Sequence, residues 1–422
     1  MRSGWLWGFL ALCALLGSAG CGGSGRTGYV YLASGTNPGS LTTYSVNLGN
    51  GTVSSSNGAL TPTGKSVSTG TQPGPMIFDS TNTFAFVADL GSPLDPGTDN
   101  TKKNGDIATF SIGKSVSISS IGLTPMPAYT TPTIPSGCAT LSPVGLALDP
   151  SGKFLFVADQ AYYNADASAT CTGLPANGTR APGVLVVFGV ASGKLTPLSV
   201  NAIPVPPAAS GTNVPQPTSV AVSNQGSFVY VTDFQNNTVA GFAYDSNGAL
   251  TSIPGQFVTV GTGPQVVFSP PAANFLYVGN NNTNDIYEFT INSDGSLVPV
   301  VGGTGIIGTG SGPVAMLSDP NAKYVYVLAH DSGQIFAYTL NRVTGTLTAV
   351  GPNGGAVSTG TGPVAFTIRS DGSTSGNFWV FASNLGANTI STFFLNGATG
   401  GLSALPQLTV PGDGAPHGIV AH

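Results

Sequence analysis

Short runs that alternate aromatic with β-branched or small residues recur along the whole chain and predict β-strands. Residues 154–159 are Phe-Leu-Phe-Val-Ala-Asp, residues 228–233 are Phe-Val-Tyr-Val-Thr-Asp, and residues 275–278 and 324–327 follow the same pattern. Such residues suit a pleated sheet that is buried against its neighbours. Turns such as Pro150–Gly152 separate the runs, because glycine reaches the positive φ values that tight turns need. The pattern therefore indicates an all-β protein of short strands.

The strands are organised in a repeat. Each copy begins with a proline and an apolar strand, continues through a turn to a second apolar strand that ends near Asp or Asn, and closes with a polar loop, an aromatic-containing strand and a Gly-x-Leu turn. The clearest copies begin at Pro143 and Pro217, and the others begin at Pro75, Pro264, Pro313 and Pro363. The later prolines lie about 50 residues apart, a spacing typical of a four-stranded propeller blade.

The two ends of the chain complete the repeat. The first copy of the repeat begins at Tyr29–Ala33, which is the second strand of a blade, and lacks the innermost strand. The last copy, Pro416–His422, is an innermost strand without the rest of its blade. Joined as blade 1, the two halves leave no open sheet edge between the first and last blades. We therefore predict a seven-bladed β-propeller of four-stranded blades over residues 28–422, closed by the C-terminal strand.

The composition agrees with this fold and excludes some partners. Charged residues make up 7% of the 422 residues, and the chain contains 60 Gly, 32 Pro and a single glutamate, Glu288. Soluble domains usually carry about 25% charged residues, which gather on helix surfaces that a propeller lacks. The net charge of -5, without a basic run, predicts no nucleic-acid binding.

The N-terminus is typical of an export signal. Trp5–Leu16 is apolar, and the small residues that follow lead into Cys21, as in a secretory signal peptide. Small residues directly before a cysteine resemble the bacterial lipobox, although Ser18 stands where leucine is usual. We expect residues 1–20 to be a lipoprotein-type signal peptide and Cys21 to carry the lipid; an ordinary signal peptide cut nearby is the alternative.

Residues 21–27 are expected to link the lipid to the propeller. No later segment has the roughly 18 unbroken apolar residues of a membrane span, so the expected membrane contact is the anchor alone. Gly22 after the cysteine favours, by the same resemblance, the outer membrane. The expected location is therefore the bacterial cell envelope, with outer membrane, periplasm and cell surface left open.

Two further cysteines, Cys138 and Cys171, remain in an oxidising compartment, where a pair is more often a disulfide than a metal site. The chain has three histidines and no Cys-x-x-Cys, so we predict neither a metal site nor a cofactor.

The phrase at residues 149–159 (Asp-Pro-Ser-Gly-Lys-Phe-Leu-Phe-Val-Ala-Asp), its copies and the closing Pro416-His417-Gly418 resemble the lactonase-type seven-bladed propellers. That family includes bacterial 6-phosphogluconolactonase and fungal muconate-lactonising enzymes, and the resemblance covers residues 28 to 422. The resemblance is strong evidence for the fold and weak evidence for lactone chemistry, because proteins of one fold can have different functions and the function depends on the residues of the site. It also implies a functional histidine at His417, since a His after this Pro is a hallmark of the family.

The innermost strands should line the central channel, with the residue after each repeat proline at its mouth. These residues are Met76, Val144, Thr218, Gln265, Val314, Val364 and His417. His417 is the ionisable one, so a catalytic interpretation makes it a general base oriented by Asp159; the alternative is a packing histidine in the closing strand. Gln265 is a candidate ligand contact.

A ring of polar residues ends the second strand of most blades: Ser34, Asp89, Asp159, Asp233, Asn280, Ala329 and Ser383. One interpretation is a rim that binds cations or hydroxyl groups. The other is that these side chains bond to the backbone of the following loop.

Long insertions follow the second strands of blades 2 and 3, at residues 90–105 and 160–183, and include Lys102, Tyr162, Tyr163 and Arg180. A disulfide-stapled loop is a candidate binding surface, where these side chains would stack on a sugar or a partner; a decorative lid is the alternative.

We therefore expect a monomeric, lipid-anchored binding or scaffold module whose ligand is a small carbohydrate, a lactone or a protein. The alternative function is a hydrolase that opens an unphosphorylated lactone. Phosphorylated substrates would call for a cluster of Arg or Lys at the site, whereas most basic residues fall near turns of the opposite face.

Overall fold

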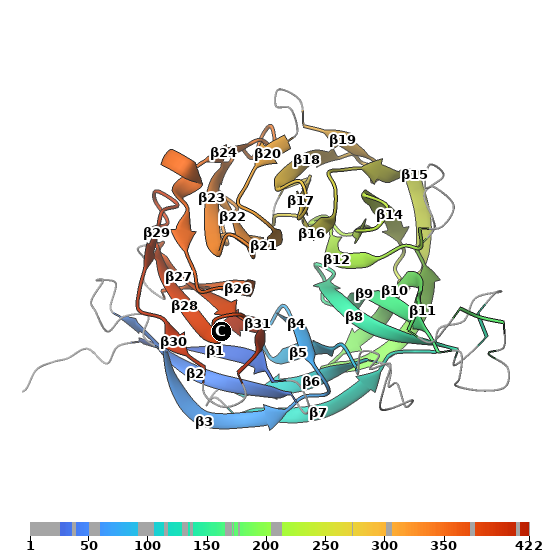
Figure 1. Ribbon diagram of the computed structural model, residues 1–422, viewed down its shortest axis with the longest axis horizontal. Helices are drawn as coiled ribbons and strands as arrows, with labels where there is room; N and C mark the ends of the chain where they lie inside the picture. Colours follow the sequence, from blue (N-terminus) through green and yellow to red (C-terminus); the bar gives the residue numbers. More distant parts are fainter. Residues whose placement is uncertain are drawn as a thin grey trace, which may run out of the picture.

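Seven antiparallel sheets stand in a ring around a central channel, with the C-terminus beside β1 (Figure 1). The computed structural model describes residues 26–35, 39–49, 60–91, 105–113, 117–128, 134–135, 138–164, 171, 173–175, 178–203, 213–271, 273–300, 306–371, 376–410 and 414–421. The predicted seven-bladed propeller is confirmed. In the part of the chain so described, no helix is long and apolar enough to cross a membrane.

The first four blades each contain four strands. Blade 1 consists of β31 (Pro416–Ala421), β1 (Arg26–Ser34), β2 (Ser40–Gly49) and β3 (Leu60–Ser68), and blade 2 of β4 (Pro73–Phe78), β5 (Phe84–Asp89), β6 (Asp106–Ile112) and β7 (Ile118–Pro125). Blade 3 consists of β8 (Ala139–Leu148), β9 (Phe154–Tyr163), β10 (Arg180–Ala191) and β11 (Lys194–Ala202), and blade 4 of β12 (Pro217–Val222), β13 (Phe228–Asp233), β14 (Thr238–Tyr244) and β15 (Leu250–Thr259).

In the last three blades the outer strand is split into two short pieces that both pair with the third strand. Blade 5 consists of β16 (Pro264–Phe268), β17 (Phe275–Asn280), β18 (Asp285–Ile291), β19 (Leu297–Pro299) and β20 (Ile306–Gly308). Blade 6 consists of β21 (Pro313–Ser318), β22 (Tyr324–Ala329), β23 (Gln334–Leu340), β24 (Leu347–Ala349) and β25 (Val357–Ser358), with the short 3-10 helix η2 (Pro352–Gly355). Blade 7 consists of β26 (Pro363–Ser370), β27 (Phe378–Asn384), β28 (Thr389–Leu395), β29 (Leu402–Ala404) and β30 (Leu408–Thr409).

The two ends of the chain close the ring as predicted. β31 pairs antiparallel with β1, so that Tyr31 faces Val420 and Leu32 faces Ile419. Blade 1 therefore takes its inner strand from the C-terminus and its other strands from the N-terminal side, and its sheet order is β3-β2-β1-β31.

The hydrophobic core consists of clusters between neighbouring blades, because each sheet packs both faces against the sheets beside it. The clusters among the described residues join blade 1 to 2, 2 to 3, and so on round the ring to 7 and 1. The second strands supply the most buried members, such as Tyr277 and Tyr326. Blade-to-blade packing thus holds the inner strands around the channel.

On the face opposite the channel mouth (the far face), glycines in turns pack against the previous blade. The Phe275 ring at the start of β17 lies against Gly345 of blade 6, where a methyl group would come within 2.5 Å of the ring. Gly345 has a φ of 82°, and its carbonyl accepts a hydrogen bond of 2.6 Å from the Tyr277 hydroxyl. Equivalent bonds join Tyr230 to Gly295 and Tyr326 to Gly400.

Strand pairing corrects two residues of the predicted repeat. In blade 2 the proline that faces the end of the second strand is Pro73, which pairs with Asp89, so the copy starts there and not at Pro75. In blade 7 Pro363 pairs with Asn384, so Asn384 and not Ser383 occupies the ring position. Both shifts arise where two nearby residues fit the pattern equally well. Pro73 and Pro75 both fit the repeat proline, and Ser383 and Asn384 both fit the polar ring position.

Candidate ligand channel

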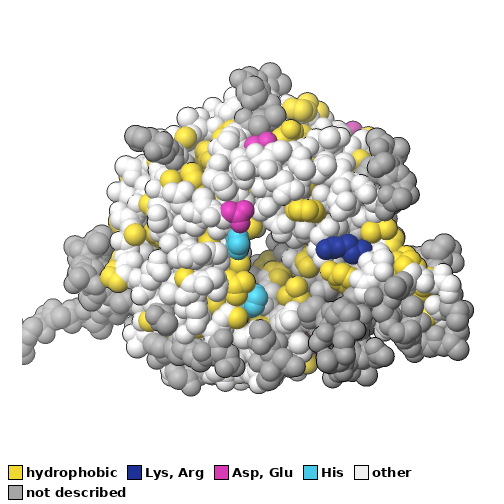
Figure 2. All heavy atoms as spheres, in the orientation of Figure 1, with side chains coloured by type: hydrophobic (Ala, Val, Ile, Leu, Met, Phe, Trp, Pro, Cys, Tyr) yellow, Lys and Arg dark blue, Asp and Glu magenta, His cyan; other side chains and the backbone are white. Residues whose placement is uncertain are grey.

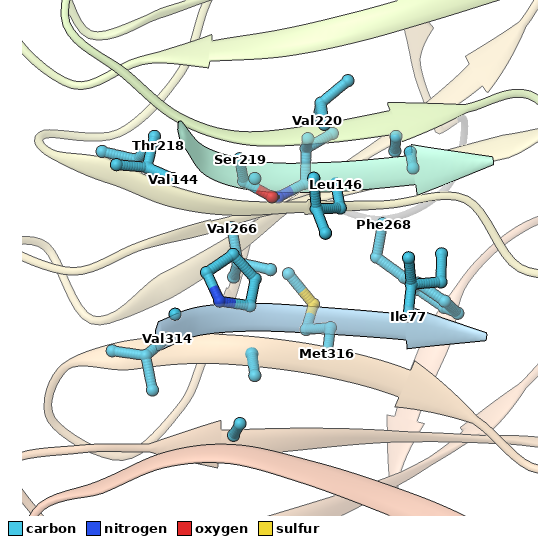
Figure 3. Close-up of a pocket in the computed structure, with 18 of the residues that line it drawn as sticks. Ile77, Val144, Leu146, Thr218, Ser219, Val220, Val266, Phe268, Val314 and Met316 are labelled. Carbon is cyan, nitrogen blue, oxygen red and sulfur yellow. The ribbon is translucent and has the colours of Figure 1, made fainter. Parts of the chain in front are cut away.

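The inner strands surround a central cavity of about 770 Å³. Its wall is mainly aliphatic, and Figure 3 shows side chains from several blades converging on it, among them Ile77, Leu146, Val266 and Met316. Every residue predicted to stand at the mouth lines this cavity: Met76, Val144, Thr218, Gln265, Val314, Val364 and His417. In blade 2, where Pro73 is the repeat proline, the residue that follows it is Gly74, which also lines the cavity. The sequence repeat therefore identified the channel wall correctly.

The polar groups of the wall differ in their availability to a ligand. The Thr218 hydroxyl donates to the Pro264 carbonyl at 2.8 Å, and the Ser219 hydroxyl accepts the Val267 N–H at 3.2 Å. Ser269 also lines the wall, and its hydroxyl has no hydrogen-bond partner among the described residues, but the hydroxyl oxygen is buried. Within the described residues, no hydrogen bond is found for the side chains of Gln265 and His417. These two groups, in blades 5 and 1, are the ones free to bind a ligand.

His417 is half-buried in β31, and burial lowers the pKa of its imidazole. Burial therefore favours the neutral form of the imidazole. The main chain of this residue is bonded to blade 7, because the Ser383 hydroxyl of β27 donates to the His417 carbonyl at 3.4 Å. Figure 2 shows the described histidines beside the central opening on one face of the molecule.

Asp159, the predicted partner of His417, has no exposed surface. The second strand of blade 3 does not end at Asp159 as predicted, because β9 continues to Tyr163. Asp159 faces Pro143 on one side and Val184 on the other. Burial raises the pKa of its carboxyl group well above the ordinary value, and neither oxygen has a hydrogen-bond partner in the part of the chain described. No contact joins Asp159 to His417, so their catalytic pairing stays a prediction.

The predicted ring positions are buried, and three of them, Asp89, Asp233 and Asn280, form hydrogen bonds to nearby loops. The Asp233 carboxylate accepts the Gln216 N–H at 2.9 Å and the Asn236 side-chain amide at 2.6 Å, and the Asn280 amide donates to Asp285 at 2.8 Å. Asp89 accepts the Gly70 N–H at 2.9 Å. These bonds hold the loops of this face in place. No cluster of three metal-binding side chains occurs in the described ranges.

A second polar group lies next to the channel mouth in blade 3. Gln160 donates to the carbonyl of Pro217, which begins β12, and accepts hydrogen bonds from Tyr162 at 2.8 Å and Arg180 at 3.3 Å. The Arg180 guanidinium lies 5.7 Å from the centre of the Tyr162 ring. Tyr163 packs against the neighbouring core. The structure thus brings three of the candidate ligand contacts into one region, whereas Lys102 and Cys21 lie outside the described residues.

The disulfide joins Cys138 to Cys171, with a Cα–Cα distance of 5.4 Å. Both cysteines are buried in the core cluster between blades 2 and 3. The bridge connects the segment before β8 to the loop between β9 and β10, on the face that carries Tyr162 and Arg180. A buried bridge is consistent with an exported protein.

One polar pair at the mouth was not predicted as functional. His330 follows β22 directly, and its Nδ1 lies 2.7 Å from the Asp331 carboxylate. The pair occupies the loop positions after the ring residue Ala329, which place it on the same face as His417 by the repeat itself. A scan of the positions after each second strand, and not only of the last strand residue, would have found it.

Comparison with known proteins agrees with this fold. Residues 184–301 and 266–366 match the family model described as Lactonase, 7-bladed beta-propeller. No curated protein sequence matches the chain.

Solved structures match almost its whole length. The periplasmic gluconolactonase of Pseudomonas aeruginosa is 17% identical and superposes with a TM-score of 0.71 over 94% of this chain and 99% of that one. A candidate 6-phosphogluconolactonase from Bacteroides fragilis is 16% identical, with a TM-score of 0.68 over 94% of this chain and 98% of that one. A third, from Bacteroides uniformis, is 17% identical, with a TM-score of 0.68 over 94% and 99%. At these identities the likeness shows the fold.

Proposed function

We propose that this chain, a seven-bladed β-propeller whose central blades match the lactonase family, is an exported module that binds a small uncharged ligand in its channel. The ligand class is a lactone or a carbohydrate derivative with an apolar face. The observation that carries the proposal is the wall of the cavity, which is aliphatic apart from a few polar groups, of which Gln265 and His417 are free to bind. Pockets of this kind bind by apolar burial and use a few polar groups to orient the ligand.

The same wall argues against a phosphorylated ligand. Recognition of phosphate calls for Arg or Lys donors in the site, and none of the described residues that line the cavity is Lys or Arg. Arg180 is near the mouth, but it already contacts Gln160 and stacks beside Tyr162. We therefore expect 6-phosphogluconate to bind more weakly than an uncharged compound of similar size.

The disulfide supports export, and the likeness to a periplasmic protein agrees with it. We propose that Cys21 carries a lipid that anchors the propeller at the cell envelope. Metabolic labelling of the wild-type protein with a clickable fatty acid, compared with Cys21→Ser, tests the anchor; label that persists on the variant would refute it.

Ligand binding is best tested with the lactam analogue of dihydrocoumarin, which is uncharged and resists hydrolysis. Val314→Trp would fill the channel, because Val314 lines it, whereas Val343 is 89% exposed on a turn of the far face, which makes Val343→Trp a matched control. The lactam should raise the melting temperature of the wild type and of V343W. V314W should bind at least about tenfold more weakly, a loss of roughly 1.4 kcal/mol. Equal binding by both variants would refute the channel as the site.

A second candidate function is hydrolysis of an unphosphorylated lactone at the channel mouth. The observation that favours it is the His330–Asp331 pair, since an imidazole held by a carboxylate is a common general base. Hydrolysis of dihydrocoumarin, followed by the release of acid, tests this function directly.

A further inference from the structure

β1 starts at the end of the propeller opposite the channel mouth. It runs from Arg26 to Ser34, and Ser34 faces Pro416, the first residue of the inner strand β31, at the mouth. Because β1 and β31 are antiparallel, Arg26 lies at the other end of the blade, where it pairs with Gly49 of β2. The chain therefore enters the propeller on the far face.

The segment between Cys21 and β1 is short compared with the height of the blade. From residue 21 to residue 26 a fully extended chain spans at most roughly 18 Å. The nine residues of β1 rise roughly 27 Å between the far face and the mouth. A lipid on Cys21 can therefore reach a bilayer at the far face, but it cannot reach one that covers the mouth.

The outer rim of blades 1 and 2 is the other surface within reach of that lipid. The strands β2 and β3 separate β1 from the rim, a distance of roughly 10 Å. In blade 2 the outer strand β7 exposes Ile121 by 47% and Leu123 by 54%. None of the residues of β7 is charged, so this strand offers no group that would bind a charged lipid headgroup. The charges of the far face distinguish it from this strand.

Basic side chains are concentrated on the far face. Of the Lys and Arg side chains that the structure describes, only Arg180 is near the mouth, and Figure 2 shows few others on that face. The remaining ones lie in or beside turns of the far face: Lys153, Lys194, Lys323, Arg342 and Arg369. The exposed acidic side chains described on the far face are Asp245 and Asp294. Its exposed charges therefore favour a surface of anionic headgroups.

One turn of the far face also exposes an apolar side chain. Val343 is 89% exposed, more than any other large hydrophobic side chain described. It follows Arg342 in the turn between β23 and β24. An apolar side chain next to a basic one suits the boundary between headgroups and acyl chains, because the apolar group leaves water while the charge stays beside the phosphates.

We propose that the far face of the propeller lies on a phospholipid bilayer with anionic headgroups, so that the channel mouth opens away from the membrane. This inference rests on the proposed lipid at Cys21, which brings the far face to the bilayer. The Lys and Arg side chains of the far face bind lipid phosphates, and Val343 enters the headgroup region. Ligands then reach the channel from the aqueous side.

Quenching of tryptophan fluorescence by brominated lipids tests this orientation on the full lipidated chain. Trp379 is the one tryptophan after residues 1–20, and it is buried, so its fluorescence is a constant background. Val343→Trp places a probe on the far face, Leu123→Trp places one on the rim, and Gln235→Trp places one in the exposed mouth loop between β13 and β14. In vesicles of phosphatidylglycerol and brominated phosphatidylcholine, V343W should lose fluorescence relative to unbrominated vesicles, whereas L123W and Q235W should keep it.

A second far-face probe and two charge changes complete the test. Ser246→Trp, in an exposed turn of blade 4, should be quenched as V343W is, and it replaces V343W if melting curves show that V343W does not fold. Lys153→Gln combined with Lys194→Gln should reduce the quenching, and Asp245→Asn should increase it. In vesicles of phosphatidylcholine alone these charge changes should have no effect.

The outcomes separate the orientation from the anchor. A chain without lipid on Cys21 refutes the anchor and with it this orientation. A lipidated chain in which Q235W is quenched, or in which L123W is quenched and both far-face probes are not, keeps the anchor and overturns the orientation. The absence of quenching from all probes also overturns it. Far-face quenching that changes with neither the lipid charge nor the Lys substitutions overturns the contact with anionic headgroups.

Discussion

Two carboxyl groups face each other inside blade 2, and we expect them to make the stability of the protein fall as pH rises. Asp89 ends β5 and pairs with Asp106, the first residue of β6. Asp89 has no exposed surface. Burial, together with the neighbouring Asp106, raises the pKa of Asp89 to about 8. Blade 5 carries an amide at the equivalent position, where Asn280 donates to Asp285 at 2.8 Å, so Asp89→Asn copies a pair that the chain already contains.

The size of the effect follows from proton linkage. The pKa of an unfolded aspartate is about 3.9, so between about pH 4 and pH 8 the folded state holds one proton more than the unfolded state. A raised folded-state pKa of an acid means that stability is highest below the unfolded value and is lost as pH rises through this window. The slope for one proton is about 1.4 kcal/mol per pH unit. From pH 5 to pH 7 the wild type should therefore lose up to about 3 kcal/mol relative to D89N.

Denaturant unfolding of both proteins at pH 5, 6 and 7 measures this difference. D89N should unfold at increasingly higher denaturant concentration than the wild type as pH rises. Asp233→Asn is the matched control, because Asp233 occupies the same ring position in blade 4 but accepts hydrogen bonds from Gln216 and Asn236; its loss should destabilise the protein. A constant difference between D89N and wild type across the three pH values would refute the protonated pair.

Three further predictions concern the packing that holds the channel. Replacing Cys138 and Cys171 together by Ala opens a loop of sequence separation 33 and should cost about 4 kcal/mol in the chain-entropy model; an unchanged denaturation midpoint would contradict this. Gly345→Ala should lower the melting temperature more than Gly255→Ala, since both strain a positive φ at about 1–2 kcal/mol but only the first drives a methyl group into the Phe275 ring. Tyr277→Phe should cost about 1–3 kcal/mol because the buried Gly345 carbonyl loses its donor, and equal stability to wild type would show that another donor replaces it.

The fold was predictable because a propeller repeats one sequence pattern, and each residue type in that pattern has a recognisable role in a strand or a turn. Aromatic and β-branched strands, turn glycines and the leading proline recur in every blade, so an error in one copy leaves the others readable. The unpaired halves at Tyr29 and Pro416 also revealed the closure. What failed was register at two points, Pro73 and Asn384, where a neighbouring residue of the same type satisfied the pattern equally well and only hydrogen-bond pairing decides.

The channel wall was predictable for the same reason, whereas the His330–Asp331 pair was not predicted. The repeat marks the residue after each proline, and all of these residues line the cavity. The ring residues drew attention because they are polar in most blades, and the hydrogen bonds of Asp89, Asp233 and Asn280 agree with the interpretation that such residues anchor loops.

A site used once per molecule should instead depart from the repeat. His330–Asp331 departs from it in sequence, since the positions after β17 carry amides and those after β27 carry Leu385 and Gly386. The positions that break a repeat are therefore where function should be sought in this fold, and the positions that obey it explain why the fold is stable.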